Sequence, residues 1–147
     1  IVGDGPQREA LLAMARSLGV AGHIELLGAR DHAEAIAEAQ AASLFVLPSV
    51  SEAFGVSYVE AMAAGVPAVG CRGEDGPEEI AASGGGIELV TPRDPAGLAE
   101  RLTALLSDPA RRSALAVAAR ATVERNFTWA RCGTDTVAAY EQALGRG

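Results

Sequence analysis

The sequence predicts an α/β fold, a doubly wound parallel sheet of the Rossmann type followed by helices. Short apolar segments alternate with segments of helical length over residues 1–91, which is the pattern of βαβ units. The segment SLFVLP contains a continuous apolar run, as expected of a strand that is covered on both faces. After Thr91 only helical spacing remains. We therefore expect residues 1–147 to form a single domain, with an alternating core at 1–91 and helices at 92–147.

The core elements are predicted from turn residues and apolar spacing. Leucines at helical spacing give the first helix an apolar side, and Gly19 ends it. Asp31 is placed as the N-cap of the second helix, and Gly65 follows the third. The expected order is a strand end at 1–3, a helix at 7–18, a strand at 23–28, a helix at 31–42, a strand at 43–48, a helix at 55–64, a strand at 67–71, a polar loop at 73–77, a short helix at 77–83 and a strand at 86–90.

The remaining chain reads as three helices. Asp94-Pro95 and Asp108-Pro109 each place a capping acid before a proline at the first helical position. A last helix is expected from about Thr128 to Leu144.

Composition limits the partners. The net charge is −7, which argues against nucleic acid and against an anionic membrane surface. All 12 basic residues are arginines, so no lysine of this chain can hold a phosphate. Two cysteines suit a reducing cytoplasm, and no apolar run approaches the roughly 18 residues of a membrane span. The chain begins with Ile1 in a strand end, so we expect the protein to extend upstream.

Two strand-to-helix loops have an ordinary structural interpretation beside a functional one. Gly3-Asp4-Gly5-Pro6 resembles the opening of a dinucleotide fingerprint, but Arg8 stands at its third glycine position. It is either a tight turn or part of a wall near a nucleotide. The loop GEDGPEEI is either an acidic turn that caps a short helix or a flexible lip over the main candidate site described next, with Glu79 or backbone amides near a bound sugar. The two histidines have no metal-ligand spacing, and no metal site is expected.

The segment PSVSEAFGVSYVEAMAAGVP carries the main candidate site. If a helix begins at Gly55, the amides at its start form an anion site. Glu60 lies one turn into that helix and suits the vicinal hydroxyls of a ribose, because a carboxylate accepts two hydrogen bonds. Glu52 lies on the other side of the bound phosphate. The alternative is that Glu52 only complements the helix dipole and Glu60 is a solvated acid. The amides predicted to bind are those of Phe54, Gly55, Val56 and Ser57.

The same segment resembles the motif of a large family of retaining glycosyltransferases, typified by sucrose-phosphate synthases and phosphatidylinositol mannosyltransferases. Its pattern ADxFVLPSxxExFGxxxxEAMAxGxPV is met here by ASLFVLPS, EAFG and EAMAAGVP. The flanking segments GDGP, LLG, GPEEI, LVTPRDPAGLAERLTALLSDP and FTW agree as well. The similarity covers nearly the whole chain, and its E-x7-E part is specific to the family.

The resemblance implies a two-domain enzyme of which this chain is the C-terminal, nucleotide-sugar-binding half. It implies that Glu52 contacts the donor sugar as the catalytic residue, in an orienting role and not as a nucleophile. It assigns sugar and diphosphate to the amides of residues 54–57, and the ribose to Glu60. With weaker support, it places the base near Gly28, Ala29 and Arg30.

The chain also departs from the family pattern. Ser43 stands where the family often has aspartate, which should matter little. The resemblance implies that the arginine and lysine that clamp the diphosphate in the family lie upstream of these residues. The first strand of the sheet and the acceptor domain are expected upstream as well.

The expected function is transfer of a sugar from a UDP- or GDP-type donor to an acceptor hydroxyl, with retention, without a cofactor and without a metal. The expected partners are that donor and the protein's own N-terminal domain, with no nucleic acid. Membrane association is expected only through absent parts or a lipid acceptor, so the expected location is the cytoplasm or the inner membrane face. Two alternatives stay open, a sugar-nucleotide epimerase of the same architecture and a non-catalytic nucleotide-binding module. Residues 1–147 alone are expected to be inactive.

Overall fold

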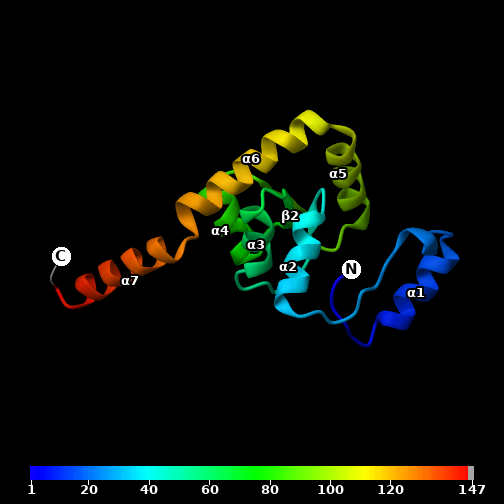
Figure 1. Ribbon diagram of the computed structural model, residues 1–147, viewed down its shortest axis with the longest axis horizontal. Coiled ribbons are helices and arrows are strands. Elements are labelled where there is room, and N and C mark those ends of the chain that lie inside the picture. Colours follow the sequence, from blue (N-terminus) through cyan, green and yellow to red (C-terminus); the bar gives the residue numbers. More distant parts are fainter. Residues whose placement is uncertain (146–147) are drawn as a thin grey trace. The chain divides into compact units, whose positions relative to one another are not determined.

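The structure, a computed structural model, describes residues 1–145 (Figure 1). The described residues form two compact units, residues 1–41 and the residues from 42 onward.

The first unit contains the helices α1 (Arg8–Ser17) and α2 (His32–Ala41) and the short 3-10 helix η1 (Ala21–His23). Asp31 caps α2 as predicted, since its carboxylate accepts the Glu34 amide at 2.8 Å. The strand predicted at 23–28 is reduced to isolated bridges, in which Val2 and Gly3 pair with Gly28. Within residues 1–145, Gly28 is the one position of this segment that takes part in these bridges, so no run of consecutive pairs forms a regular strand.

The second unit is built on a parallel sheet of three strands in the order β1-β2-β3. Their bounds are Phe45–Val46 for β1, Ala68–Cys71 for β2 and Ile87–Val90 for β3. The predicted parallel pairing of these strands is confirmed. The strand predicted at 43–48 is shorter than expected, although the Leu47 amide still bonds to the Val69 carbonyl at 3.0 Å.

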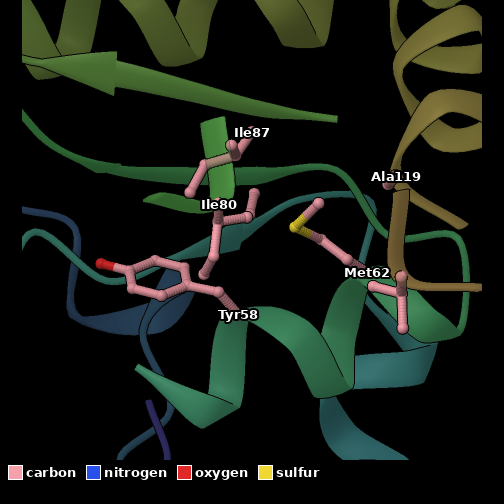
Figure 2. Packing of buried hydrophobic residues seen from close by; sticks show 7 residues of the cluster. Tyr58, Met62, Ile80, Ile87 and Ala119 are labelled. Atoms are coloured by element: carbon pink, nitrogen blue, oxygen red, sulfur yellow. The ribbon is translucent and has the colours of Figure 1, made fainter. Parts of the chain in front are cut away.

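Alternating residues of β2 face two apolar clusters. Ala68 belongs to the cluster with Tyr58, Met62 and Ile80 on one side of the sheet (Figure 2). Val69 and Cys71 belong to the other cluster, which includes Leu105. Because side chains alternate along a strand, both faces of β2 are buried. This explains why the predicted strands show continuous apolar runs.

In the described part of the second unit, five helices accompany the sheet: α3 (Val56–Ala63), α4 (Asp75–Ser83), α5 (Pro95–Ser107), α6 (Pro109–Asn126) and α7 (Trp129–Ala143). The predicted caps Asp94 and Asp108 are confirmed, since each accepts an amide of its own helix. Thr128 likewise caps α7, where the sequence predicted only the start of a helix. The predicted start of α4 is wrong by two residues, because Asp75 and Gly76 already lie within the helix. No helix among residues 1–145 is both long and apolar enough to cross a membrane.

Helix α6 packs closely on the segment before β3. A methyl group on Gly86 would lie 2.1 Å from the Cα of Ala119, so only glycine allows this approach. The Thr122 hydroxyl is buried and donates to the Gly85 carbonyl at 2.9 Å. The Asn126 amide donates to the Ser83 carbonyl at 2.9 Å. These contacts hold α6 against the sheet on the side where α3 also packs.

Candidate functional site

The candidate site lies where β1 ends and α3 begins. A loop of residues 47–55 connects the two elements, and Gly55 precedes the first turn of α3 with a φ of 79°. In a parallel sheet, ligands bind beyond the carboxyl ends of the strands, where such loops lead into helices. The predicted helix start at Gly55 is confirmed to within one residue, because α3 begins at Val56.

Gly55 is required by the packing beneath it. A Cβ at Gly55 would lie 2.4 Å from Cδ2 of Tyr58, and its φ is one that favours glycine. The Tyr58 ring is fully buried and meets Phe45 edge to face, with 5.7 Å between the ring centroids. Its hydroxyl donates to the Leu47 carbonyl at the end of β1. Tyr58 thus fixes both ends of the loop.

The start of α3 presents backbone donors. The Tyr58 amide is used internally, since it donates to the Gly55 carbonyl at 2.9 Å. Within residues 1–145, the amides of residues 54–57 donate to no backbone carbonyl and to no side chain. The Val56 residue is 60% exposed. These groups can therefore meet a ligand that supplies acceptors, and the helix dipole favours an anion there.

The two glutamates flank this helix start along the chain. Glu52 is half-buried, and its Cγ lies 3.4 Å from the position of a Cβ on Gly55, so its side chain passes beside the first turn of α3. Glu60 is also half-buried and lies in α3 itself, one turn after Val56. The structure therefore brings Glu52 and residues 54–57 together, with Glu60 further along the same helix. What each residue binds stays a prediction.

The loop GEDGPEEI packs directly on the Glu52 loop. The Glu74 carboxylate accepts the Glu52 amide at 2.7 Å. A Cβ on Gly76 would lie 2.0 Å from the Phe54 carbonyl oxygen, so the two backbones touch. Glu79, which the sequence suggested for this loop, is exposed on α4. The contacts of Glu74 and Gly76 with the Glu52 loop were not predicted, because no local sequence pattern marks a contact between segments 22 residues apart.

Burial and nearby acids shape the ionisation of the groups under the loop. Desolvation raises the pKa of Tyr58, and the negative charges of Glu52, Cys71 and Glu74 raise it further. Burial, followed by the charge of Glu74, also raises the pKa of the Cys71 thiol. The Tyr58 hydroxyl is therefore a hydrogen-bond donor throughout the physiological range.

The other predicted residues belong to the first unit. Gly28 has a φ of 74° and accepts the Gly3 amide at 2.8 Å. Ala29 and Arg30 are exposed, and Arg30 lies 3.8 Å from Glu34 in an exposed ion pair. The proximity of residues 28–30 to a base stays a prediction. In the segment GDGP, the Gly5 amide donates to its neighbour Asp4 at 2.8 Å, as in a tight turn.

Neither histidine is placed in a cluster of ligands. Both lie on exposed positions of the first unit, His23 in η1 and His32 at the start of α2. In the part of the chain that the structure describes, no group of three or more His, Cys, Asp or Glu side chains is placed to hold a metal ion.

Comparison with known proteins places the chain among enzymes of sugar transfer. Residues 1–122 match the family described as glycosyl transferases group 1. The chain is 36% identical over 140 residues to a glycogen synthase of Mycobacterium tuberculosis, covering 95% of this chain and 34% of that protein. It is 35% identical over 137 residues to the D-inositol 3-phosphate glycosyltransferase of Corynebacterium diphtheriae, covering 92% of this chain and 31% of that protein.

Solved structures agree with this assignment. The sucrose-phosphate synthase of Thermosynechococcus elongatus superposes with a TM-score of 0.82 at 26% identity, over 99% of this chain and 38% of that one. The Anabaena HepE protein in complex with UDP-glucose superposes with a TM-score of 0.81 at 25% identity, over 96% of this chain and 40% of that one. The chain thus spans about a third of the length of the curated relatives it matches.

Proposed function

The chain belongs to the group 1 glycosyl transferases, and from this membership we propose that it binds the nucleotide-sugar donor of a retaining enzyme whose other domain binds the acceptor. Its fold is that of the C-terminal half of such two-domain enzymes. The observation that carries the proposal is the start of α3, where backbone donors that have no partner within residues 1–145 lie beside Glu52. The donor class is a nucleoside diphosphate sugar of the UDP or GDP type, as in the UDP-glucose complex of the related HepE protein.

In this proposal the amides of residues 54–57 hold the diphosphate. When the bond from the sugar's anomeric carbon to the diphosphate breaks, negative charge grows on the departing phosphate oxygen. Fixed N–H dipoles at a helix start stabilise that charge without reorganising. The acceptor oxygen bonds to the anomeric carbon on the same face, and its proton passes to the departing phosphate oxygen.

The two glutamates have separate roles in the proposal. Glu52 accepts hydrogen bonds from the hydroxyls of the donor sugar and orients it. Glu60 accepts the paired ribose hydroxyls, which a carboxylate can bind with both oxygens. Both side chains are half-buried, so each is partly desolvated and still reachable by a ligand. Residues 28–30 are proposed to lie near the base.

The donor and its base can be tested on residues 1–147. Titration with UDP, GDP and ADP, followed by amide chemical shifts, should move the signals of residues 54–57 and Glu60 with one nucleotide more than with the others. The affinity is expected to be weak, because residues 1–147 contain neither an acceptor domain nor the arginine and lysine that clamp the diphosphate in the family. No sugar transfer is expected from residues 1–147 alone. Robust transfer by them would overturn the domain assignment.

Turnover is tested on the full-length protein. We expect Glu52→Ala to reduce the release of UDP or GDP from the donor far more than it reduces nucleotide affinity. Turnover within a few-fold of the wild type would refute the orienting role. Incubation with the donor alone distinguishes a transferase from an epimerase, because only an epimerase would yield an isomeric nucleotide sugar without an acceptor.

A further inference from the structure

The loop that carries Glu52 is held at three points by groups outside it. The buried Tyr58 hydroxyl donates to the Leu47 carbonyl at its start. The Glu74 carboxylate accepts the Glu52 amide in its middle. The backbone of Gly76 rests on Phe54 near its end. Residue Ser51 has a left-handed φ of 65°, which is uncommon for a residue with a side chain and persists where surrounding contacts impose it.

Glu74 is an unusual residue for the place it occupies. It is the N-cap of α4, a position that favours Ser, Thr, Asp or Asn over glutamate. Its side chain accepts no amide of its own helix. The neighbouring loop amide of Gly73 is instead satisfied by Glu78, at 2.9 Å. The Glu74 carboxylate is therefore not used to cap α4 and is available for the Glu52 loop.

The hydrogen bond from the Glu52 amide to Glu74 fixes the backbone of Glu52, the residue proposed to orient the donor sugar. It joins segments 22 residues apart, at a distance of 2.7 Å typical of a charge-assisted hydrogen bond. Both acids lie close enough to the Tyr58 hydroxyl to act on it electrostatically. Since the Glu52 side chain passes beside Gly55, a rotation of the Glu52 backbone would carry its carboxylate away from the start of α3.

We propose that Glu74 is a positioning residue that holds Glu52 in the orientation needed to bind the donor sugar. This inference rests on the proposed function of the site. Glu74 itself touches neither the sugar nor the diphosphate, and it acts only through the Glu52 backbone. The expected consequence is specific: losing this bond should weaken recognition of the sugar while leaving the diphosphate on the α3 amides.

The test uses the full-length protein with UDP and UDP-glucose as probes, or GDP and GDP-mannose if those are its substrates. Calorimetry gives the affinity of the nucleotide and of the nucleotide sugar, and nucleotide release gives kcat. We expect Glu74→Ala to lower kcat by at least about tenfold, since misplacing a group by about 1 Å can cost up to about a hundredfold. The affinity for UDP should stay within about twofold of the wild type. The affinity for UDP-glucose should fall toward that for UDP, because the contacts of Glu52 with the glucose are lost.

Three further variants separate the loss of the Glu52–Glu74 hydrogen bond from a loss of charge and from a general effect at the start of α4. Glu74→Gln keeps an acceptor of the same reach without the charge, and it should recover most of kcat. Glu74→Asp keeps the charge but shortens the side chain by about 1.5 Å, so it should behave like alanine. Glu78→Ala is the matched control, because it removes a carboxylate bond to a loop amide at the same helix start without touching the Glu52 loop.

The outcomes are distinguishable. If the wild-type protein binds neither nucleotide sugar, the proposed function fails. If it binds and turns over the donor while Glu74→Ala behaves like Glu78→Ala, the positioning role fails and the proposed function stands. Wild-type kcat in Glu74→Asp together with a loss in Glu74→Gln would assign the effect to charge and would also overturn the role. If Glu74→Ala does not fold, the glutamine and aspartate variants decide the question alone.

Discussion

Replacing Gly76 by alanine would place a methyl group 2.0 Å from the Phe54 carbonyl oxygen and 2.3 Å from its Cα. Gly76 lies in the first turn of α4, where alanine is by itself favoured over glycine by about 1 kcal/mol. Any loss must therefore come from this contact. All three nearest atoms belong to the Phe54 backbone, so no side-chain rotation can relieve it.

The size of the effect follows from the geometry. Carbon atoms in van der Waals contact are separated by about 3.5 Å, so the Phe54 loop and α4 must move apart by about 1 Å or more. Overpacking of this kind costs about 1–3 kcal/mol, which exceeds the gain in helix propensity. We expect a lower thermal midpoint, by about 2–4 °C for each kcal/mol in a domain of this size. Displacing the Phe54 amide should also weaken nucleotide binding.

The assay compares Gly76→Ala with Gly133→Ala in the full-length protein, by thermal unfolding and by UDP titration. Gly133 lies within α7 and a Cβ there would meet no atom within 4 Å. Gly133→Ala should therefore be neutral or stabilising and should bind UDP like the wild type. Equal stability and equal affinity of the two variants would show that the contact between α4 and the Phe54 loop does not shape the site.

Two further substitutions test the packing around the site. Gly86→Ala should lower the free energy of unfolding by about 2 kcal/mol or more, because a methyl group would lie 2.1 Å from the Ala119 Cα at a φ of 97°; urea unfolding measures this, and an unchanged midpoint would contradict it. Tyr58→Phe should remove a specific pH dependence. Since the pKa of Tyr58 is raised in the folded state, its contribution is complete below its unfolded pKa of about 10 and is lost as the pH rises above that value. The wild type should therefore lose stability above about pH 10 more steeply than Tyr58→Phe, and parallel pH profiles of the two proteins would refute this.

Local patterns in the sequence determined most of the elements. Asp94 and Asp108 cap their helices as expected, and α3 begins directly after Gly55. These features depend on contacts within a few residues, such as a side chain that accepts an amide of the next turn. The parallel sheet was also predicted locally. A strand that is buried on both faces has a continuous run of apolar residues, and this run is visible in the sequence.

Tertiary structure decided the features that depend on two distant segments. The strand predicted at 23–28 is reduced to bridges, because its length depends on a partner that the segment does not encode. The bond from Glu52 to Glu74 and the contact of Gly76 with Phe54 arise only when two loops meet at one edge of the sheet. The sequence alone therefore determined which helix start and which acids are candidates for the site. Only the folded chain revealed the contacts that hold the Glu52 loop in place. The energy of such a contact depends on residues that are neighbours in space and not along the chain.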